Sequence, residues 1–169
     1  MKFEIPKPMK IEHDELHADL VKATKAGGQT AEAAKAVARV LHSHFVKEEE
    51  YALPPLGLLT ALAKGTLEPG MADVLELTDK LEAELPHMLD EHKEILAALK
   101  GLVDAAKAEN KMEHARFAER LMVHALAEEQ VSYPTALLIG RYLKAALPNL
   151  GQKKILDDDS CLSISSAFR

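Results

Sequence analysis

The sequence predicts an all-α protein, an antiparallel up-down four-helix bundle that is followed by a C-terminal tail. Apolar residues recur with the helical period of 3.6 along four long stretches, and runs of β-branched and aromatic residues with a period of two are absent. Hydrophobic residues make up 47% of the 169 residues, aromatic residues make up only 4%, and tryptophan is absent. The core is therefore expected to be aliphatic, as is typical of helical bundles.

The first two helices are expected at residues 11–25 and 30–63. The glycine pair at 27–28 should end the first helix, and Thr30 is a candidate N-cap for the second. The proline pair at 54–55 should kink the second helix or end it early, because proline lacks the backbone donor that a helix needs.

The third helix is expected at residues 71–109 and the fourth at 111–147. Pro86 should break or bend the third helix, and Pro134 should bend the fourth. Asn110, with an acidic residue three positions later, is a candidate cap for the fourth helix. Two helical hairpins that face each other can bury apolar surfaces that neither hairpin could bury alone.

The bundle domain is expected at residues 1–148 and the tail at 149–169. The tail lacks helical periodicity and carries three consecutive aspartates, several serines and Cys161. We expect an appendage that packs on the bundle or is loosely held, with a docking or regulatory element as the alternative. A single cysteine excludes an internal disulfide bond and fits a reducing compartment, so the expected localisation is cytoplasmic.

The formal net charge is −6, and the sequence contains no basic cluster. This distribution argues against nucleic acid and against anionic membrane as partners. The longest apolar stretch, at residues 52–63, is too short to span a bilayer. The N-terminus has no apolar run behind a basic start, so it does not read as a signal peptide.

The chain contains the same set of metal-ligand side chains twice. The motif His-x-x-x-Glu-Glu occurs in both halves, with a proline ten residues after each histidine, and a further histidine precedes each motif. The repeated imidazoles and carboxylates stand in register: His13 with His92, His44 with His124, and Glu48 with Glu128. Burying polar groups is costly unless they are satisfied, so packing alone does not explain this duplication.

Helix geometry predicts that these side chains point into the core. Residues i and i+4 share a helix face, so His44 and Glu48 lie on the face that also carries Val37 and Leu41. Four imidazoles divide into two per ion, and two carboxylates can bridge both ions. Imidazole and carboxylate donors together suit Fe, Mn or Zn, and bridging carboxylates with open positions favour redox-active iron. We therefore expect two Fe ions in a bridged di-iron centre, with an oxo or hydroxo bridge.

The order and spacing of these six residues resemble the haemerythrin-like, or HHE cation-binding, domain family. The resemblance covers residues 10–145, and the second glutamate and the later proline of each motif also match the family's pattern. It implies an up-down four-helix bundle around a non-haem di-iron centre. Members of this family are associated with oxygen carriage, sensing of oxygen or nitric oxide, peroxide chemistry, iron handling and repair of iron centres.

The sequence departs from the oxygen-carrying branch of that family at two positions. Leu96 stands where that branch has an additional histidine, and Glu128 stands where it has an aspartate. The pattern is closer to the branch with four histidines and two glutamates, which includes iron-centre repair proteins.

Several residues near the expected site keep two interpretations. His17 shares a helix face with the first histidine, and it is either a fifth ligand or a surface residue. Tyr51 is either a core tyrosine or a group near an open coordination position, whereas Tyr133 is expected to serve in packing. Glu49 and Glu129 either face solvent or contact the ligands. The alternative for the six repeated histidines and glutamates is a buried polar network that holds no metal.

Three functions remain open from the sequence. The first is a di-iron protein that binds or senses O2 or NO, with no membrane or nucleic-acid partner and an unknown redox partner. The second is a di-iron enzyme that acts on peroxide or nitric oxide. The third is an iron storage or donor protein, and a structural zinc bundle is more distant. The sequence alone does not decide whether the protein is an enzyme.

Overall fold

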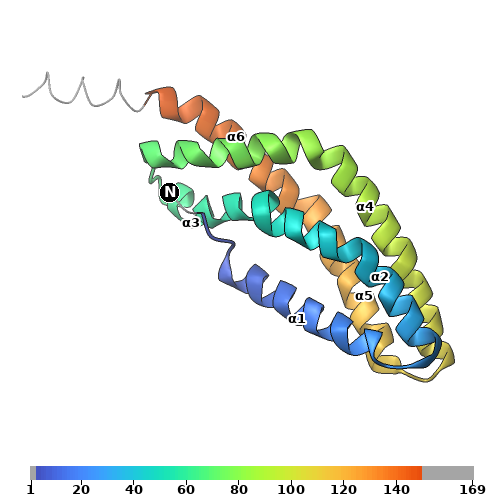
Figure 1. The fold of residues 1–169 in the computed structure, drawn as a ribbon. Coiled ribbons are helices and arrows are strands. Elements are labelled where there is room, and N and C mark those ends of the chain that lie inside the picture. Colours follow the sequence, from blue (N-terminus) through green and yellow to red (C-terminus); the bar gives the residue numbers. More distant parts are fainter. Residues whose placement is uncertain (1–2, 150–169) are drawn as a thin grey trace, which may run out of the picture.

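The computed structural model describes residues 3–149, and every regular element in this range is helical. Four long helical segments pack against one another as an antiparallel bundle, which confirms the predicted fold class (Figure 1). The α-helices are α1 (Lys7–Thr24), α2 (Gly28–Lys47), α3 (Leu59–Ala63), α4 (Val74–Ala108), α5 (Met112–Ala127) and α6 (Tyr133–Ala146). The tail predicted at 149–169, with Cys161, lies outside the described residues apart from its first residue.

Shorter helical turns connect or extend these helices. Two π-helical turns directly follow α2 and α5: η1 (Glu48–Ala52) and η4 (Glu128–Ser132). The described residues also form three 3-10 turns: η2 (Pro54–Leu58), η3 (Pro69–Asp73) and η5 (Leu147–Asn149). The second helix was expected to kink or end early at its proline pair, and it ends early: α2 stops at Lys47, the π turn η1 follows, and the 3-10 turn η2 begins at Pro54.

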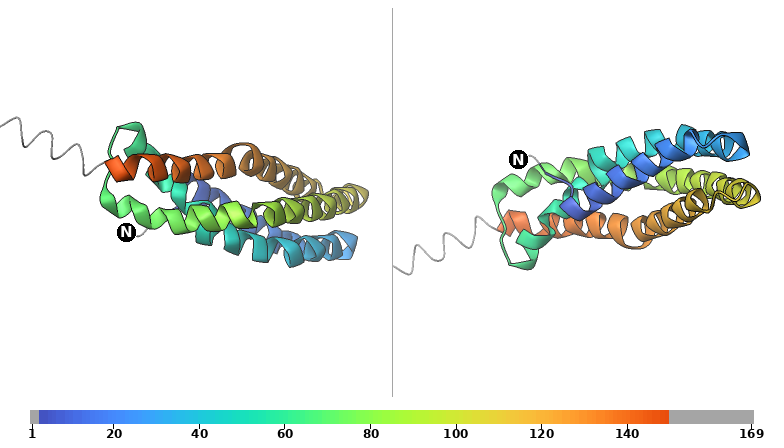
Figure 2. Two further views of the ribbon diagram at one scale, coloured as in Figure 1. Left: turned by 90° about the horizontal axis from the view of Figure 1, so that it is seen from above. Right: turned by 90° about the horizontal axis from the view of Figure 1, so that it is seen from below.

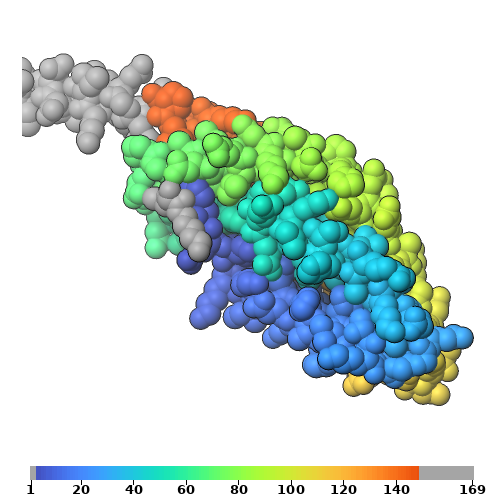
Figure 3. Space-filling model, viewed as in Figure 1, coloured from blue at the N-terminus to red at the C-terminus, as the bar shows by residue number. Residues whose placement is uncertain are grey.

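The bundle consists of two helical hairpins. Helices α1 and α2 form the first, and α4 with α5 and α6 forms the second, with both hairpin loops at the same end of the molecule (Figures 1 and 2). The connection from the first hairpin to the second lies at the opposite end. In the space-filling view, α1, α2 and α4 cover one face of the bundle (Figure 3). No helix within residues 3–149 is both long and apolar enough to cross a lipid bilayer.

Helix α4 continues through Pro86 without a break. Figure 1 shows that α4 instead changes direction partway along its length, so of the two predicted outcomes, a break or a bend, only the bend occurs. Proline cannot donate to the carbonyl four residues earlier, but packing on both sides of a long helix can hold the chain helical across that gap.

The two hairpin loops are tied together by Glu109. Its carboxylate accepts hydrogen bonds from the backbone N–H groups of Gln29 and Thr30, at 2.7 and 3.2 Å, and from the Thr30 hydroxyl at 2.6 Å. The predicted N-cap role of Thr30 is therefore wrong: α2 begins at Gly28, and a carboxylate from the other hairpin satisfies its first donors. The predicted cap role of Asn110 is also wrong, because Asn110 takes a left-handed conformation (φ 56°) just beyond α4.

The core consists of two apolar clusters at different levels of the bundle. The cluster nearer the hairpin loops includes Leu16, Leu41 and Leu99, and the cluster nearer the termini includes Leu81 and Leu143. The duplicated histidines and glutamates occupy the level between them. The polar layer is thus enclosed on both sides by aliphatic side chains, which keep water out.

Candidate metal centre

The six side chains singled out by the duplication come together at the centre of the bundle, and all six are buried. Each of the four long helical segments contributes at least one of them: α1 carries His13, α2 and η1 carry His44 and Glu48, α4 carries His92, and α5 and η4 carry His124 and Glu128. They form two groups of donors that could hold metal ions, with Glu128 in both groups.

The first group consists of His44, Glu48, His92 and Glu128, whose ligand atoms all lie within 4.8 Å of one another. His44 Nε2 is 3.1 Å from Glu48 Oε1. His92 Nε2 is 3.8 Å from Glu48 Oε1 and 3.7 Å from Glu128 Oε2. One imidazole comes from each hairpin, so this group forms only when the two hairpins pack together.

The second group consists of His13, His124 and Glu128. Glu128 Oε1 lies 3.0 Å from His124 Nε2 and 3.3 Å from His13 Nε2, and the two Nε2 atoms are 3.2 Å apart. Because Glu128 turns Oε1 to this group and Oε2 to the first, its carboxylate has the placement of a bridge. Glu48 lies farther from the second group than Glu128 does, because its Oε2 is 3.9 Å from His13 Nε2.

The donor set fits a metal ion at each group. Two donors that each lie about 2.1 Å from one ion, at an angle of about 90–110°, stand about 3.0–3.4 Å apart. The shorter separations given above fall in this range. Within residues 3–149, the buried Glu48 Oε2 has no hydrogen-bond partner, which a cation between the groups would provide.

The pKa shifts of Glu48 and Glu128 also favour a cation site. Burial disfavours the charged form of Glu48, but the neighbouring imidazoles of His44 and His92 outweigh it and lower the pKa of Glu48 well below its usual value. Burial and the negative charge of Glu48 raise the pKa of Glu128. Burial alone would lower the pKa of His44 and of His124, but the neighbouring glutamates raise both. The protein alone therefore disfavours two charged carboxylates here, and cations would favour them.

Each of the four histidines has a second carboxylate on its outer side. All four turn Nε2 toward the centre, and each Nδ1 lies within 3.5 Å of a glutamate oxygen outside it: His13 with Glu49, His44 with Glu91, His92 with Glu129, and His124 with Glu12. The Nδ1 atoms of His44 and His92 are hydrogen-bonded to their glutamates, at 2.8 and 3.0 Å, and carboxylates in this position orient a ligating imidazole and raise its basicity. Among the described residues, the buried His13 Nδ1 has no hydrogen-bond partner. The four outer glutamates are themselves repeat counterparts, Glu12 with Glu91 and Glu49 with Glu129.

The two π turns begin at the two ligand glutamates. The N–H of Leu53 donates to the carbonyl of Glu48, and the N–H of Tyr133 donates to that of Glu128, five residues back in each case. A proline, Pro54 or Pro134, comes directly after each of these donor residues; it cannot donate, and its ring would crowd the carbonyl four residues earlier. π turns of this kind are frequent at functional sites. Here they change which side chains share the face of the ligands.

Tyr133 belongs to the site, which corrects the expectation that it serves in packing. Its buried hydroxyl donates a hydrogen bond to Glu48 Oε1 and lies 3.3 Å from His44 Nε2 and 3.2 Å from His92 Nε2. In a regular α-helix, residue i+5 lies about 140° around the axis from residue i. The π turn brings Tyr133 back over Glu128, and only the proline after it hinted at this in the sequence.

The remaining candidates lie outside both donor groups. The Tyr51 hydroxyl contacts Met88 Sδ at 3.5 Å, and burial raises the pKa of Tyr51 to about 12, as expected of a core tyrosine. His17 is exposed on α1 and belongs to neither group. The sequence left open whether Glu49 and Glu129 face solvent or contact the ligands; in the structure each lies on the outer side of a histidine.

No family model, curated protein or solved structure matches the chain.

Proposed function

We propose that the protein is a haemerythrin-like non-haem di-iron protein that binds O2 or NO. His44, Glu48, His92 and Glu128 would hold one ion, and His13, His124 and the other oxygen of Glu128 would hold the second. When bound, the iron pair would supply reversible one-electron chemistry and a coordination position for a diatomic molecule.

The proposal rests on the different number of donors in the two groups. The first group offers four protein donors, and the second offers three among the described residues. A metal ion held by three side chains keeps positions open for an exogenous ligand, whereas a closed set of four serves structure. His17 does not complete the second group, and the position at which oxygen carriers have a further histidine is Leu96.

The surroundings of the second group suit a small neutral ligand. Phe45 stacks on the imidazole of His13 with ring centroids 4.4 Å apart, and its ring lies 6.3 Å from that of His124. The apolar residues Leu16 and Leu41 are almost fully buried at the neighbouring level. Such an apolar setting favours neutral diatomic molecules, which need no charged partner.

Absorption spectra test the proposal directly. The protein is loaded with iron, reduced without oxygen and exposed separately to O2 and to NO. A spectral change that reverses when the gas is removed supports binding. Spectra that respond to neither gas, from protein that retains its iron, would contradict it.

An enzyme that turns over peroxide is a second candidate, and the Tyr133 hydroxyl is the observation that favours it. This hydroxyl lies against Glu48, His44 and His92, and burial raises its pKa, so it would serve a peroxide bound at the first donor group as a hydrogen-bond donor and not as a source of protons. Oxygen evolution from added hydrogen peroxide, lost in Tyr133→Phe at unchanged iron content, would favour the enzyme over the binding protein.

A further inference from the structure

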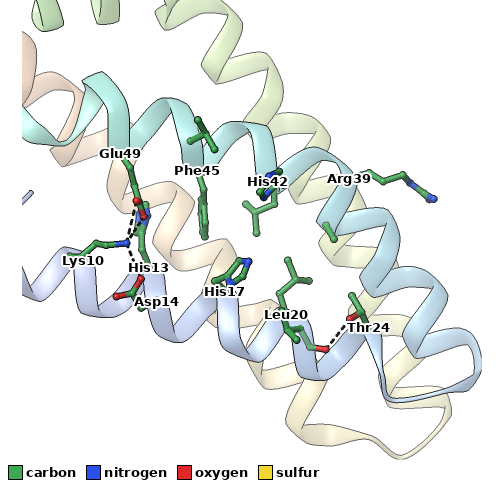
Figure 4. Close-up of a pocket in the computed structure, with 14 residues that line it drawn as sticks. Lys10, His13, Asp14, His17, Leu20, Thr24, Arg39, His42, Phe45 and Glu49 are labelled. Carbon is green, nitrogen blue, oxygen red and sulfur yellow. Dashed lines mark hydrogen bonds and ion pairs between the residues drawn. The ribbon is translucent and has the colours of Figure 1, made fainter.

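A pocket of about 690 Å³ lies between α1 and α2, beside the second donor group (Figure 4). His13 and Phe45 form its wall toward the metal centre, and Leu20, Leu41 and Val46 supply apolar surface. This volume is within the range of about 300–1,000 Å³ that is typical of sites for small organic molecules. A diatomic molecule would use only a small part of it.

The second hairpin provides an internal comparison for this pocket. His17 and His42, which line it from α1 and α2, are both exposed. Their repeat counterparts on the second hairpin are Leu96 and Met122, which are partly buried, and Met122 packs against the core. The equivalent positions thus carry bulky apolar side chains in the second hairpin and two polar rings in the first.

The charges at one end of the pocket leave a small negative excess. There the Lys10 ammonium binds Asp14 at 2.8 Å and Glu49 at 3.0 Å, so one cation faces two carboxylates. Figure 4 shows that the Arg39 side chain extends away from the pocket. The polar groups that can meet a ligand include the exposed imidazoles of His17 and His42, which can donate or accept hydrogen bonds, and the Thr24 hydroxyl.

We propose that the α1–α2 pocket binds an uncharged ring compound with a hydrogen-bonding oxygen, of the phenol or quinone class. The apolar side chains and the Phe45 ring would hold the ring system, and His17 and His42 would hold the oxygen. The negative excess at the Lys10 end disfavours an organic anion, and an organic cation would meet there only carboxylates that are already paired with Lys10. Binding in this pocket does not require a bound metal. The pocket is nevertheless close to the second donor group, because the Phe45 ring that lines it stacks on the imidazole of His13.

Calorimetric titration with 2-naphthol tests the proposal on the full chain as purified, with its metal content measured in parallel. The double variant His17→Leu, His42→Met installs the residues that the second hairpin carries at the same positions. It should weaken 2-naphthol binding by about tenfold or more. Lys100→Leu, which adds a leucine to the exposed face of α4, is the control and should bind as the wild type does.

Two results would overturn the proposal: no saturable binding of 2-naphthol by the wild type, or unchanged affinity in a double variant that retains wild-type helicity. Tighter binding of the anion 2-naphthoate than of 2-naphthol would overturn the assigned ligand class. Should the double variant not fold, histidine NMR signals of the wild type decide: signals of His17 and His42 that move during titration support the site, and signals that stay fixed refute it. A wild type without metal that still binds 2-naphthol would leave this site standing while the proposed function fails.

Discussion

The hydroxyl of Tyr133 donates a hydrogen bond to Glu48, although the two residues belong to different hairpins. The contact depends on the π turn of residues 128–132, which brings a side chain five positions after Glu128 back to the ligand face. The counterpart of Tyr133 in the first hairpin is Leu53, which has no hydroxyl. The duplicated centre is therefore asymmetric, and the first donor group alone has a phenol beside it.

Tyr133→Phe should lower the affinity of the first metal ion by about tenfold, because it removes a partner that fixes Glu48. Tyr51→Phe is the matched control, since both tyrosines are 1% exposed but the Tyr51 hydroxyl contacts only Met88 Sδ at 3.5 Å. Competition with a chelator measures the affinity of each variant. Equal loss in both variants would mean that Tyr133 acts only through packing.

Substitution of single ligands should change metal stoichiometry in steps. His13→Ala removes a donor of the second group only and should leave about one ion per chain, since the first group keeps its four donors. Glu128→Ala removes the carboxylate that both groups share, so it should lose the second ion, whose group keeps two donors, and weaken binding of the first, whose group keeps three. Metal analysis after gel filtration checks both values. His42→Ala, at an exposed position outside both groups, is the control and should keep the wild-type stoichiometry.

Glu129→Gln should weaken metal binding by about 10–100-fold while leaving the ligand set intact. Glu129 Oε1 lies 3.0 Å from His92 Nδ1, and a neutral amide would hold that imidazole less firmly and make it less basic. Glu119→Gln, at an exposed ion pair with Lys107, is the control. Affinities measured by chelator competition should separate the two variants, and identical affinities would remove Glu129 from the centre.

Glu109 should make the stability of the bundle depend on pH in acid. Hydrogen bonds from Lys111, Thr30 and Gln29 lower the pKa of Glu109 from 4.5 to about 2. Because the folded-state pKa is depressed, this stabilisation is complete above the unfolded-state value and disappears as the pH falls through about 2. The stability difference between wild type and Glu109→Gln, from urea unfolding, should therefore be largest at neutral pH and should shrink between pH 4.5 and 2.

An exposed glutamate on the outer face of α4 controls for the loss of charge alone. Glu94→Gln should change the free energy of unfolding little at any pH in this range. A stability difference for Glu109→Gln that stays constant with pH would show that its carboxylate does not couple the hairpin loops.

The sequence predicted the bundle and the convergence of six side chains because both follow from periodicity. A helical period fixes which residues face inward, and duplication of His44 and Glu48 as His124 and Glu128 fixes how two hairpins present them to each other. Contacts that depend only on regular helix geometry can therefore be predicted from the residue pattern.

The details that were missed depend on departures from regular geometry or on contacts between distant segments. Tyr133 reaches the site through a π turn, which spacing rules for an α-helix assign to the wrong face. Glu109 caps α2 from the other hairpin, a contact that local capping rules do not consider. The pairing of each histidine with an outer glutamate likewise needed the packing of the four helices, because most partners lie on different helices.

Metal analysis of the full chain, beside Glu128→Ala prepared in the same way, tests most directly whether two ions share this centre. Wild-type protein should contain about two iron ions per chain, and the variant should contain no more than one, because its second group keeps only two donors. Wild-type protein that takes up one ion or none when iron is supplied, or a variant that keeps both ions, would contradict a centre bridged by Glu128.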